Sequence, residues 1–377
     1  MGKIIVAIDS FKGCLTSTEA NQAAAAGILA RMPEAEVIQI PVSDGGEGWL
    51  EALGGGPTPP LPSREGGPTL AHTSREGVLV EVDVRDPLMR RITAPYWVLG
   101  DTAVIETAKA SGLTLLTPEE RNPLVATSYG TGQLVADAVR RGCRHIIVGL
   151  GGSATSDCGI GMIRAIIDSF AKHGSWDDIR ELDSVRFTIA TDVTNPLCGE
   201  NGAAHVFAPQ KGATQEMVPL LDARAKRFAE VSARHFGYDR QHVPGAGAAG
   251  GLGYAFLQYM NAECRPGIDL LLDAIGFDRL LTDATMVITG EGASDRQTLM
   301  GKVPYGILQR ASARQIPVVL IAGRISDRQQ LLDAGFAQVE CINPPELLCS
   351  TKEEVLKPET AKRNIRETLQ RLQNTNR

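Results

Sequence analysis

The sequence has few aromatic residues, no long hydrophobic run and no cysteine pair at metal-binding spacing. Aromatic residues make up 5% of its 377 residues. No apolar run approaches the ~18 to 20 residues of a membrane-spanning helix, and the N-terminus lacks the basic segment, long apolar core and cleavage site of a signal peptide. The seven cysteines are never spaced as CxxC, which argues against a disulfide framework and against a zinc site. We therefore expect reduced thiols, a cytoplasmic location and no membrane partner.

An excess of positive charge is also missing. The 38 Lys and Arg residues face 44 Asp and Glu residues, which gives a formal net charge of −6. Binding along a nucleic-acid backbone requires a basic surface, so we do not expect nucleic acid as a partner. A small anionic ligand needs only a few local cations. The apolar content of 43% and the chain length are typical of a globular protein with two domains.

Several familiar catalytic signatures are absent. The sequence has no Walker A pattern, none of the Gly-rich, HRD and DFG motifs of protein kinases, and no G-x-S-x-G elbow. Residues 245–250 match the dinucleotide fingerprint G-x-G-x-x-G, but the residues before them lack the strand pattern that the fingerprint requires. We interpret this segment as a loop that opens a helix and serves either phosphate binding or close packing.

The stretch from His145 to Phe170 has the pattern of a strand, a glycine-rich loop and a helix. An apolar run is followed by glycine and hydroxyl residues as far as Asp157, and apolar residues then recur at helical spacing. Free N–H groups and the helix dipole at such an N-terminus favour an anion. Gly159 and Gly161 would each cost about 1 kcal/mol relative to alanine in a helix, which packing alone rarely explains. The pattern therefore predicts a phosphate site.

Strands and helices alternate at both ends of the chain. The hydrophobic patterns predict strands at 3–8, 36–40, 78–84, 92–99, 145–148, 186–191, 285–289, 318–322 and 338–341, and helices from about 16, 128, 160, 217 and 304. Residues 16–19, Thr-Ser-Thr-Glu, predict a capping box at the start of the first of these helices. This alternation predicts a doubly wound α/β fold of the Rossmann or flavodoxin-like type, with a parallel sheet.

The predicted domains are not continuous in the sequence. The first two strand–helix units need further strands to make a stable sheet, and the last third of the chain offers three. We expect residues 1–50 and 284–377 to form one domain, with a second α/β domain, 51–283, inserted in it. Residues 54–77 are rich in Gly and Pro and are expected to form a surface loop.

Five loops at predicted strand ends carry glycine beside a charged or hydroxyl residue. They contain Ser10 and Lys12; Asp44, Gly45 and Gly46; Gly151, Gly152 and Ser153; Asp192 and Asn195; and Glu291 and Asp295. Ligands of open α/β sheets lie outside the carboxyl ends of the strands. Phosphoryl transfer needs this mixture, because carboxylates hold Mg²⁺ or accept a proton while cations and N–H groups neutralise phosphoryl oxygens. Helix capping explains any one of these loops equally well, but it does not require all five.

The sequence resembles bacterial glycerate kinases of the type I class across nearly its full length. The motifs that carry the resemblance are residues 9–13, 43–48, 149–157, 192–197, 208–212, 244–253 and 289–298. The resemblance implies ATP-dependent phosphorylation of D-glycerate to 2-phosphoglycerate, and a two-domain α/β fold with the active site between the domains. The chain departs from the family pattern in the long 54–77 segment and at residues 292–295, where Gly-Ala-Ser-Asp replaces the more common Gly-Arg-Leu-Asp.

The resemblance also suggests roles for the polar loops. The residues expected to bind glycerate or the transferring phosphoryl group are Ser10, Lys12, Gly45, Gly46 and Asn195. The preferred general base is Asp192, with Asp44 as the alternative. The residues expected to bind the phosphates of ATP are Gly151, Gly152, Ser153, Thr155, Gly247 and Gly250, although the 149–157 loop could instead shape the glycerate pocket. The expected Mg²⁺ ligands are Glu291 and Asp295, with Asp157 as an outer group near the metal.

Other functions on the same fold stay open at this point. One alternative is a kinase that phosphorylates another small hydroxy acid. The other is a non-catalytic sensor that binds a sugar acid without turning it over. The sequence also leaves open a homodimer and the choice between a 2- and a 3-phosphoglycerate product.

Overall fold

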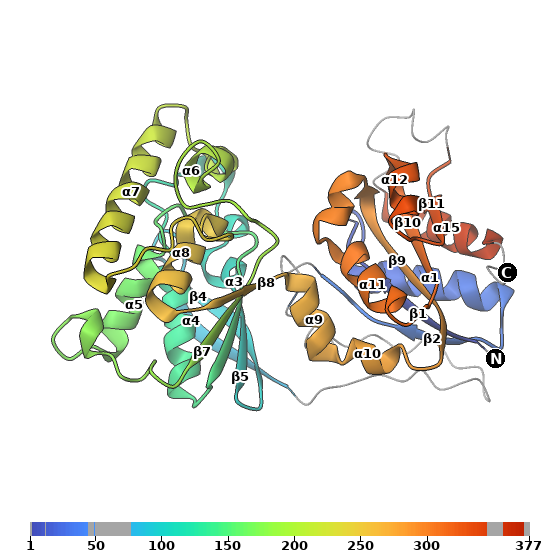
Figure 1. Ribbon diagram of the computed structural model, residues 1–377, viewed down its shortest axis with the longest axis horizontal. Helices are drawn as coiled ribbons and strands as arrows, with labels where there is room; N and C mark the ends of the chain where they lie inside the picture. The colour runs from blue at the N-terminus through green and yellow to red at the C-terminus, as the bar shows by residue number, and fades with distance from the viewer. Residues whose placement is uncertain (1, 12, 44–48, 50–76, 345–356, 373–377) are drawn as a thin grey trace. The chain divides into compact units, whose positions relative to one another are not determined.

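A computed structural model describes residues 2–11, 13–43, 49, 77–344 and 357–372 (Figure 1). These residues belong to two compact units. The first combines the described residues of 1–44 with those of 268–377, and the second contains Trp49 and residues 77–267. Apart from Gly77, the Gly/Pro-rich segment 54–77 lies outside the described residues.

The first unit contains a five-stranded parallel sheet. Its strands are β1 (Lys3–Ile8), β2 (Glu36–Gln39), β9 (Ala284–Ser294), β10 (Val318–Ile325) and β11 (Gln338–Cys341). Their order across the sheet is β2-β1-β9-β10-β11, and all four pairings are parallel. This is the flavodoxin-like order, in which the chain leaves β1 in one direction to reach β2 and returns on the other side as β9. The switch point between β1 and β9 is where ligands of such sheets bind.

The helices of the first unit follow the strands in alternation. They are α1 (Ser17–Arg31), α9 (Gly267–Ile275), α10 (Phe277–Leu280), the 3₁₀ turn η5 (Arg296–Met300), α11 (Val303–Ser312), α12 (Arg328–Asp333) and α15 (Pro358–Arg371).

Helix α1 fixes the carboxyl ends of β1 and β2. It begins with the expected capping box, in which Thr16 Oγ1 accepts from Glu19 N and Glu19 Oε2 accepts from Thr16 N. The Asn21 amide, buried in α1, donates to the Ile40 carbonyl at 2.8 Å and accepts from Ile8 N at 2.9 Å. These bonds hold the strand ends at the switch point in place.

The second unit contains a six-stranded mixed sheet. Its strands are, in spatial order, β3 (Val78–Arg85), β4 (Arg91–Leu99), β5 (Thr102–Glu106), β6 (His145–Gly149), β7 (Arg186–Ala190) and β8 (Glu263–Arg265). The pairs β3–β4 and β4–β5 are antiparallel, whereas β5 to β8 run parallel.

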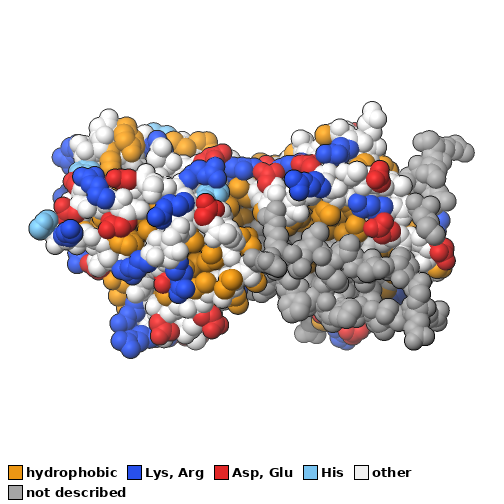
Figure 2. Space-filling model, turned by 90° about the horizontal axis from the view of Figure 1, so that it is seen from below, with side chains coloured by type: hydrophobic (Ala, Val, Ile, Leu, Met, Phe, Trp, Pro, Cys, Tyr) orange, Lys and Arg blue, Asp and Glu red, His pale blue; other side chains and the backbone are white. Residues whose placement is uncertain are grey.

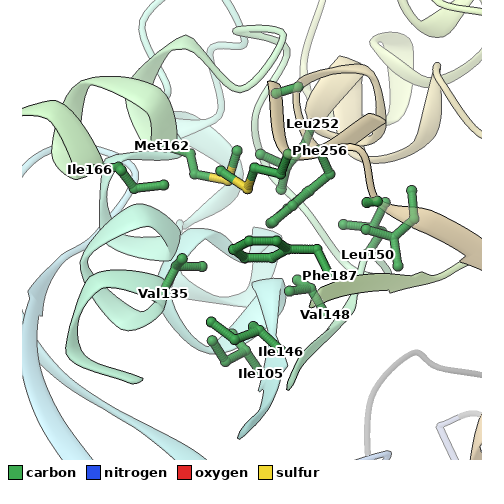
Figure 3. Packing of buried hydrophobic residues seen from close by; sticks show 14 of the residues in the cluster. Ile105, Val135, Ile146, Val148, Leu150, Met162, Ile166, Phe187, Leu252 and Phe256 are labelled. Atoms are coloured by element: carbon green, nitrogen blue, oxygen red, sulfur yellow. The ribbon is translucent and has the colours of Figure 1, made fainter. Parts of the chain in front are cut away.

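Helices and short turns connect the parallel strands of this unit. They are α3 (Thr107–Ser111), η1 (Leu113–Leu115), η2 (Pro118–Glu120), α4 (Tyr129–Arg140), α5 (Ile160–Phe170), η3 (Trp176–Asp178), α6 (Ala203–Phe207), η4 (Pro209–Lys211), α7 (Met217–Phe236) and α8 (Ala248–Met260). The apolar faces of α3, α4, α5, α7 and α8 and the sheet form one hydrophobic core (Figure 3), and Ala204, Ala208 and Leu221 form a smaller, separate cluster. Phe187 of β7 packs against Phe256 of α8, with ring centroids 6.1 Å apart. This core holds the carboxyl ends of β5 to β8 rigidly.

The α/β class with parallel sheets is confirmed, and two strands were missed. β5 follows β4 after a two-residue turn and is only five residues long, so its pattern merges with the preceding run. β8 has three residues, too few for a periodic signal. The six cysteines within the described residues are free, as expected.

On the face shown in Figure 2, Lys and Arg side chains are interspersed with Asp and Glu over both units. None of the helices in the described part of the chain combines the length and apolar character needed to cross a membrane.

Candidate active site

The switch point of the first sheet brings two acidic residues to neighbouring strands. Asp9 directly follows β1, and its N–H donates to the Gly290 carbonyl of β9 at 2.9 Å. Glu291 is the next residue of β9, and both carboxylic residues are buried. Ser10 N donates to Asp9 Oδ1 at 2.7 Å, so the first residue of the predicted substrate loop is held by Asp9. Sequence reasoning placed Ser10 and Glu291 in the site but gave Asp9 no role.

Hydroxyl groups and one lysine surround the Glu291 carboxylate. Its Oε1 accepts from Thr298 Oγ1 at 2.6 Å and from Ser294 Oγ at 3.0 Å. Lys302 Nζ lies 3.6 Å from Oε2. The second predicted metal ligand, Asp295, uses Oδ1 to accept from Gln297 N at 2.7 Å and so caps the η5 turn.

The metal assignment stays a prediction. Within the described ranges, no group of three or more His, Cys, Asp and Glu side chains gathers to hold a metal ion. Mg²⁺ often takes only one or two carboxylates, with water and substrate phosphates as its other ligands. The Glu291 carboxylate, whose Oε1 accepts from two hydroxyl groups and whose Oε2 lies near Lys302, is compatible with a role as one of these one or two carboxylate ligands. Four other predicted site residues lie outside the described residues, namely Lys12, Asp44, Gly45 and Gly46.

The parallel strands of the second sheet end in register. Glu106, Gly149, Ala190 and Arg265 are consecutive partners across β5, β6, β7 and β8. In a parallel sheet such partners share a face, so this edge presents an acidic side chain and a basic side chain on the same face. Glu106 is 2% exposed, and its Oε2 lies 3.6 Å from Lys109 Nζ. Sequence reasoning missed Glu106 and Arg265, although Glu106 ends an apolar run just as Asp9 and Asp192 do.

Asp192 lies two residues beyond this row, after β7. Its Oδ1 accepts from the N–H of Gly267, the last residue of the second unit, at 3.3 Å. Asn195, in the same loop, donates from Nδ2 to the Asn201 carbonyl at 2.8 Å and accepts at its own carbonyl from Gly247 N at 2.9 Å. The loop that follows β7 is therefore tied to the glycine-rich loop before α8.

The loop between β6 and α5 has a few N–H groups available for a ligand. Gly152 is exposed with φ of 71°, a left-handed conformation that favours glycine. Among the described residues, no acceptor takes a hydrogen bond from the N–H of Gly151, Gly152 or Ser153. Thr155 is fully buried, its N–H donates to Ser153 Oγ, and its hydroxyl shares a hydrogen bond with that oxygen. Thr155 thus shapes the loop from inside.

The carboxylate of Asp157 already occupies the N-terminus of α5. Asp157 Oδ1 accepts from Gly159 N, and Oδ2 accepts from Gly161 N, both at 3.1 Å. Oδ2 also accepts from Ser128 N at 2.8 Å and Ser128 Oγ at 2.9 Å. Because the side chain of Asp157 occupies this place, the expectation of a ligand anion on the helix N-terminus is corrected. The N–H groups that have no acceptor among the described residues lie earlier, at 151–153.

Packing accounts for the glycines that the sequence pattern assigned to function. A Cβ at Gly161 would overlap Thr127 Oγ1 of the segment before α4. A Cβ at Gly250 would overlap the Thr155 carbonyl oxygen, and one at Gly247 would overlap the Pro196 carbonyl oxygen. The glycine-rich segment 244–253 is thus packed between the β6–α5 and β7–α6 connections. A Cβ at Gly159 would overlap the Ala255 side chain, so the expectation that packing would not explain such glycines is wrong for both Gly159 and Gly161. The phosphate-binding role of Gly247 and Gly250 stays a prediction.

Lys211 is a buried cation beside this loop. Its side chain is 3% exposed, and Nζ donates to the Thr155 carbonyl at 2.6 Å. Burial lowers the pKa of Lys211 to about 8, and the negative charge of Asp157 opposes the shift. The motif at 208–212 supports the family resemblance, but sequence reasoning assigned Lys211 no role, because burial of a lysine leaves no periodic signal.

Comparisons with known proteins agree along almost the whole chain. The model of a family described as the glycerate kinase family matches residues 4–57, 60–176 and 175–376. The chain is 39% identical over 344 residues to a glycerate kinase from Bacillus subtilis (strain 168), covering 86% of this chain and 85% of that one. It is 38% identical over 365 residues to a glycerate 2-kinase from Escherichia coli (strain K12), covering 90% and 91%.

A solved structure shows the same fold. The crystal structure of a protein described as glycerate kinase 2 from Salmonella typhimurium LT2 superposes with a TM-score of 0.77 at 36% sequence identity. The match covers 98% of this chain and 96% of the other.

The burial of Lys211 predicts a pH-dependent stability. Between pH 8 and 10.5 the unfolded lysine binds a proton that the folded one has released, so the free energy of unfolding rises with pH. Relative to Lys211→Met, the unsubstituted protein should gain about 1 kcal/mol per pH unit in this window. Urea unfolding at several pH values measures the difference. Lys226→Met, at an exposed lysine, is the control, and equal slopes for the unsubstituted and Lys211→Met proteins would contradict the assignment.

Proposed function

The chain belongs to the glycerate kinase family, and we propose that it transfers a phosphoryl group from ATP to a hydroxyl of D-glycerate, giving 2-phosphoglycerate. The observation that carries the proposal is the match to that family over nearly all residues, with relatives named glycerate kinase and glycerate 2-kinase. The reaction is that of a phosphotransferase with an alcohol acceptor.

The β6–α5 loop is the proposed site for the phosphates of ATP. Gly151, Gly152 and Ser153 supply N–H groups, and Gly152 adopts the left-handed backbone that favours glycine. The internal bonds of Thr155 and the Lys211 ammonium fix the loop before the ligand arrives. Such prearranged donors stabilise developing negative charge without reorganisation.

Other loop residues are proposed to act as the general base, to bind glycerate and to hold the metal ion. Asp192 is the proposed general base that accepts the proton of the reacting glycerate hydroxyl, with Asp44 as the alternative. Ser10, Lys12, Gly45, Gly46 and Asn195 are proposed to bind glycerate. Glu291 and Asp295 are proposed to hold Mg²⁺, which would offset the charge of the phosphoryl oxygens.

A coupled assay of ADP release tests the function directly. With ATP, Mg²⁺ and D-glycerate we expect steady turnover, and ³¹P NMR of the product should show the phosphate on the C2 oxygen. A phosphate on C3 would overturn the proposed product. Turnover with another small hydroxy acid but not with D-glycerate would overturn the proposed substrate. Calorimetric binding of D-glycerate without any turnover would replace the kinase by a sensor.

Asp192→Asn tests the general base. Loss of the base should lower kcat at least 100-fold, within the range typical of general-base catalysis, while the KM for ATP changes less than about threefold. Asp178→Asn is a matched control, because Asp178 also accepts a backbone N–H, from His173, but lies in the η3 turn that precedes β7. A kcat of Asp192→Asn within about threefold of the unsubstituted enzyme excludes this role.

Gly152→Ala tests the phosphate loop. The added methyl group would lie 3.1 Å from the Ala108 Cβ of α3 and would strain the left-handed backbone of Gly152. It should therefore shift the loop N–H groups and raise the KM for ATP about tenfold or more. Gly174→Ala is the control: Gly174 has nearly the same backbone, with φ of 76° against 71°, and lies outside the loop. Both variants should lose about 1 kcal/mol of stability to the left-handed conformation. An equal KM for ATP in the two variants argues against the loop assignment.

A further inference from the structure

Helix α3 and the turn after it lie directly against the loop that is proposed to bind phosphate. Leu113 N donates to the Gly152 carbonyl at 2.8 Å, and Ala154 N donates to the Ser111 carbonyl at 2.9 Å. A Cβ placed on Gly152 would lie 3.1 Å from the Cβ of Ala108 in α3. Hydrogen bonds and side-chain packing therefore hold α3 beside the β6–α5 loop.

This short helix carries a lysine whose ammonium group lies at the edge of the sheet. Lys109 Nζ is 3.6 Å from Oε2 of Glu106, the last residue of β5. Glu106 pairs in register with Gly149, at the end of β6, and neighbouring strands are about 4.8 Å apart. The backbone of Lys109 follows Ala108, which faces Gly152. Both ends of the Lys109 side chain therefore border the β6–α5 loop.

The ammonium group of Lys109 is available to a ligand. Its side chain is 31% exposed, and its separation of 3.6 Å from Glu106 is longer than a hydrogen bond. No acceptor in the described part of the chain takes a hydrogen bond from it. The Glu106 side chain is only 2% exposed, and a buried carboxylate needs a cation nearby. Glu106 thus keeps the ammonium group at the loop without occupying its N–H donors.

A loop that binds the phosphates of ATP needs an exposed cation in addition to N–H groups. A lysine ammonium is a common point charge for phosphate, because it offsets the negative charge of the phosphoryl oxygens. Lys211 does not meet this need, since it is 3% exposed and donates to the Thr155 carbonyl from inside the unit. Lys109 combines exposure with a position beside the loop.

We propose that Lys109 binds the phosphates of the nucleotide held on residues 151–153, and that Glu106 positions its ammonium group. The proposal rests on the proposed kinase function, because that function places the phosphates on this loop. It goes beyond that function by naming the cation that meets the phosphates and the buried carboxylate that holds this cation in place.

Lys109→Met tests the cation. Loss of a charge-assisted contact to phosphate should raise the Kd for MgADP, measured by calorimetric titration, about tenfold or more. The KM for ATP should rise similarly, while the KM for D-glycerate changes less than about threefold. Lys226→Met is the matched control, because Lys226 of α7 also pairs with a buried carboxylate, that of Asp222, at 2.8 Å. Lys109→Arg keeps the charge and should bind MgADP within about threefold of the unsubstituted protein.

A double variant separates phosphate binding from simple neutralisation of Glu106. Lys109→Met alone leaves a buried carboxylate without its cation, whereas Lys109→Met combined with Glu106→Gln leaves neither charge. The double variant should bind MgADP as weakly as Lys109→Met. Affinity restored to that of the unsubstituted protein overturns the phosphate contact, and a further loss beyond Lys109→Met overturns the positioning role of Glu106. Thermal unfolding of each variant shows whether the fold is kept.

The outcomes also separate this proposal from the kinase function. If the unsubstituted protein phosphorylates glycerate and Lys109→Met binds MgADP as tightly as Lys226→Met does, Lys109 does not bind the phosphates and the kinase function stands. If glycerate is not phosphorylated but MgADP binds and Lys109→Met weakens it, the kinase function fails and the assignment of Lys109 is supported. Absence of MgADP binding to the unsubstituted protein overturns the assignment of Lys109.

Discussion

The carboxylate of Asp157 is the interaction on which the arrangement of the second unit depends. It accepts from the N-terminal N–H groups of α5 and from both the backbone and the hydroxyl of Ser128, the residue before α4. One side chain therefore joins the starts of two helices that cover the same sheet. Because the negative charge comes from the chain itself, the dipole of α5 is satisfied without a ligand. The preceding residues, 151–153, keep N–H groups that have no acceptor in the described part of the chain, and of these residues Gly152 is exposed.

Close backbone packing also fixes the β6–α5 loop on the side that faces α8. The glycine-rich segment 244–253 lies so near Thr155 and Pro196 that no side chain fits at Gly250 or Gly247. Lys211 adds a hydrogen bond to the Thr155 carbonyl from within the unit. The loop is thus fixed by Asp157, by the glycine-rich segment 244–253 and by Lys211. A phosphate-binding loop requires such rigidity. In the first unit, the ends of β1 and β9 place Asp9 and Glu291 together through sheet pairing alone.

How well a strand or helix could be predicted from the sequence depends on its length. Long buried strands such as β1 and β10, and the capping box of α1, were predicted because periodicity and capping are local signals. β5 and β8 were missed because they are short, and with β5 missing the position of Glu106 at the sheet edge was missed too. The glycines at 159, 161, 247 and 250 were recognised as unusual, but the sequence could not show whether a ligand or a neighbouring backbone required them. That distinction depends on contacts between residues 34 to 96 positions apart in the sequence.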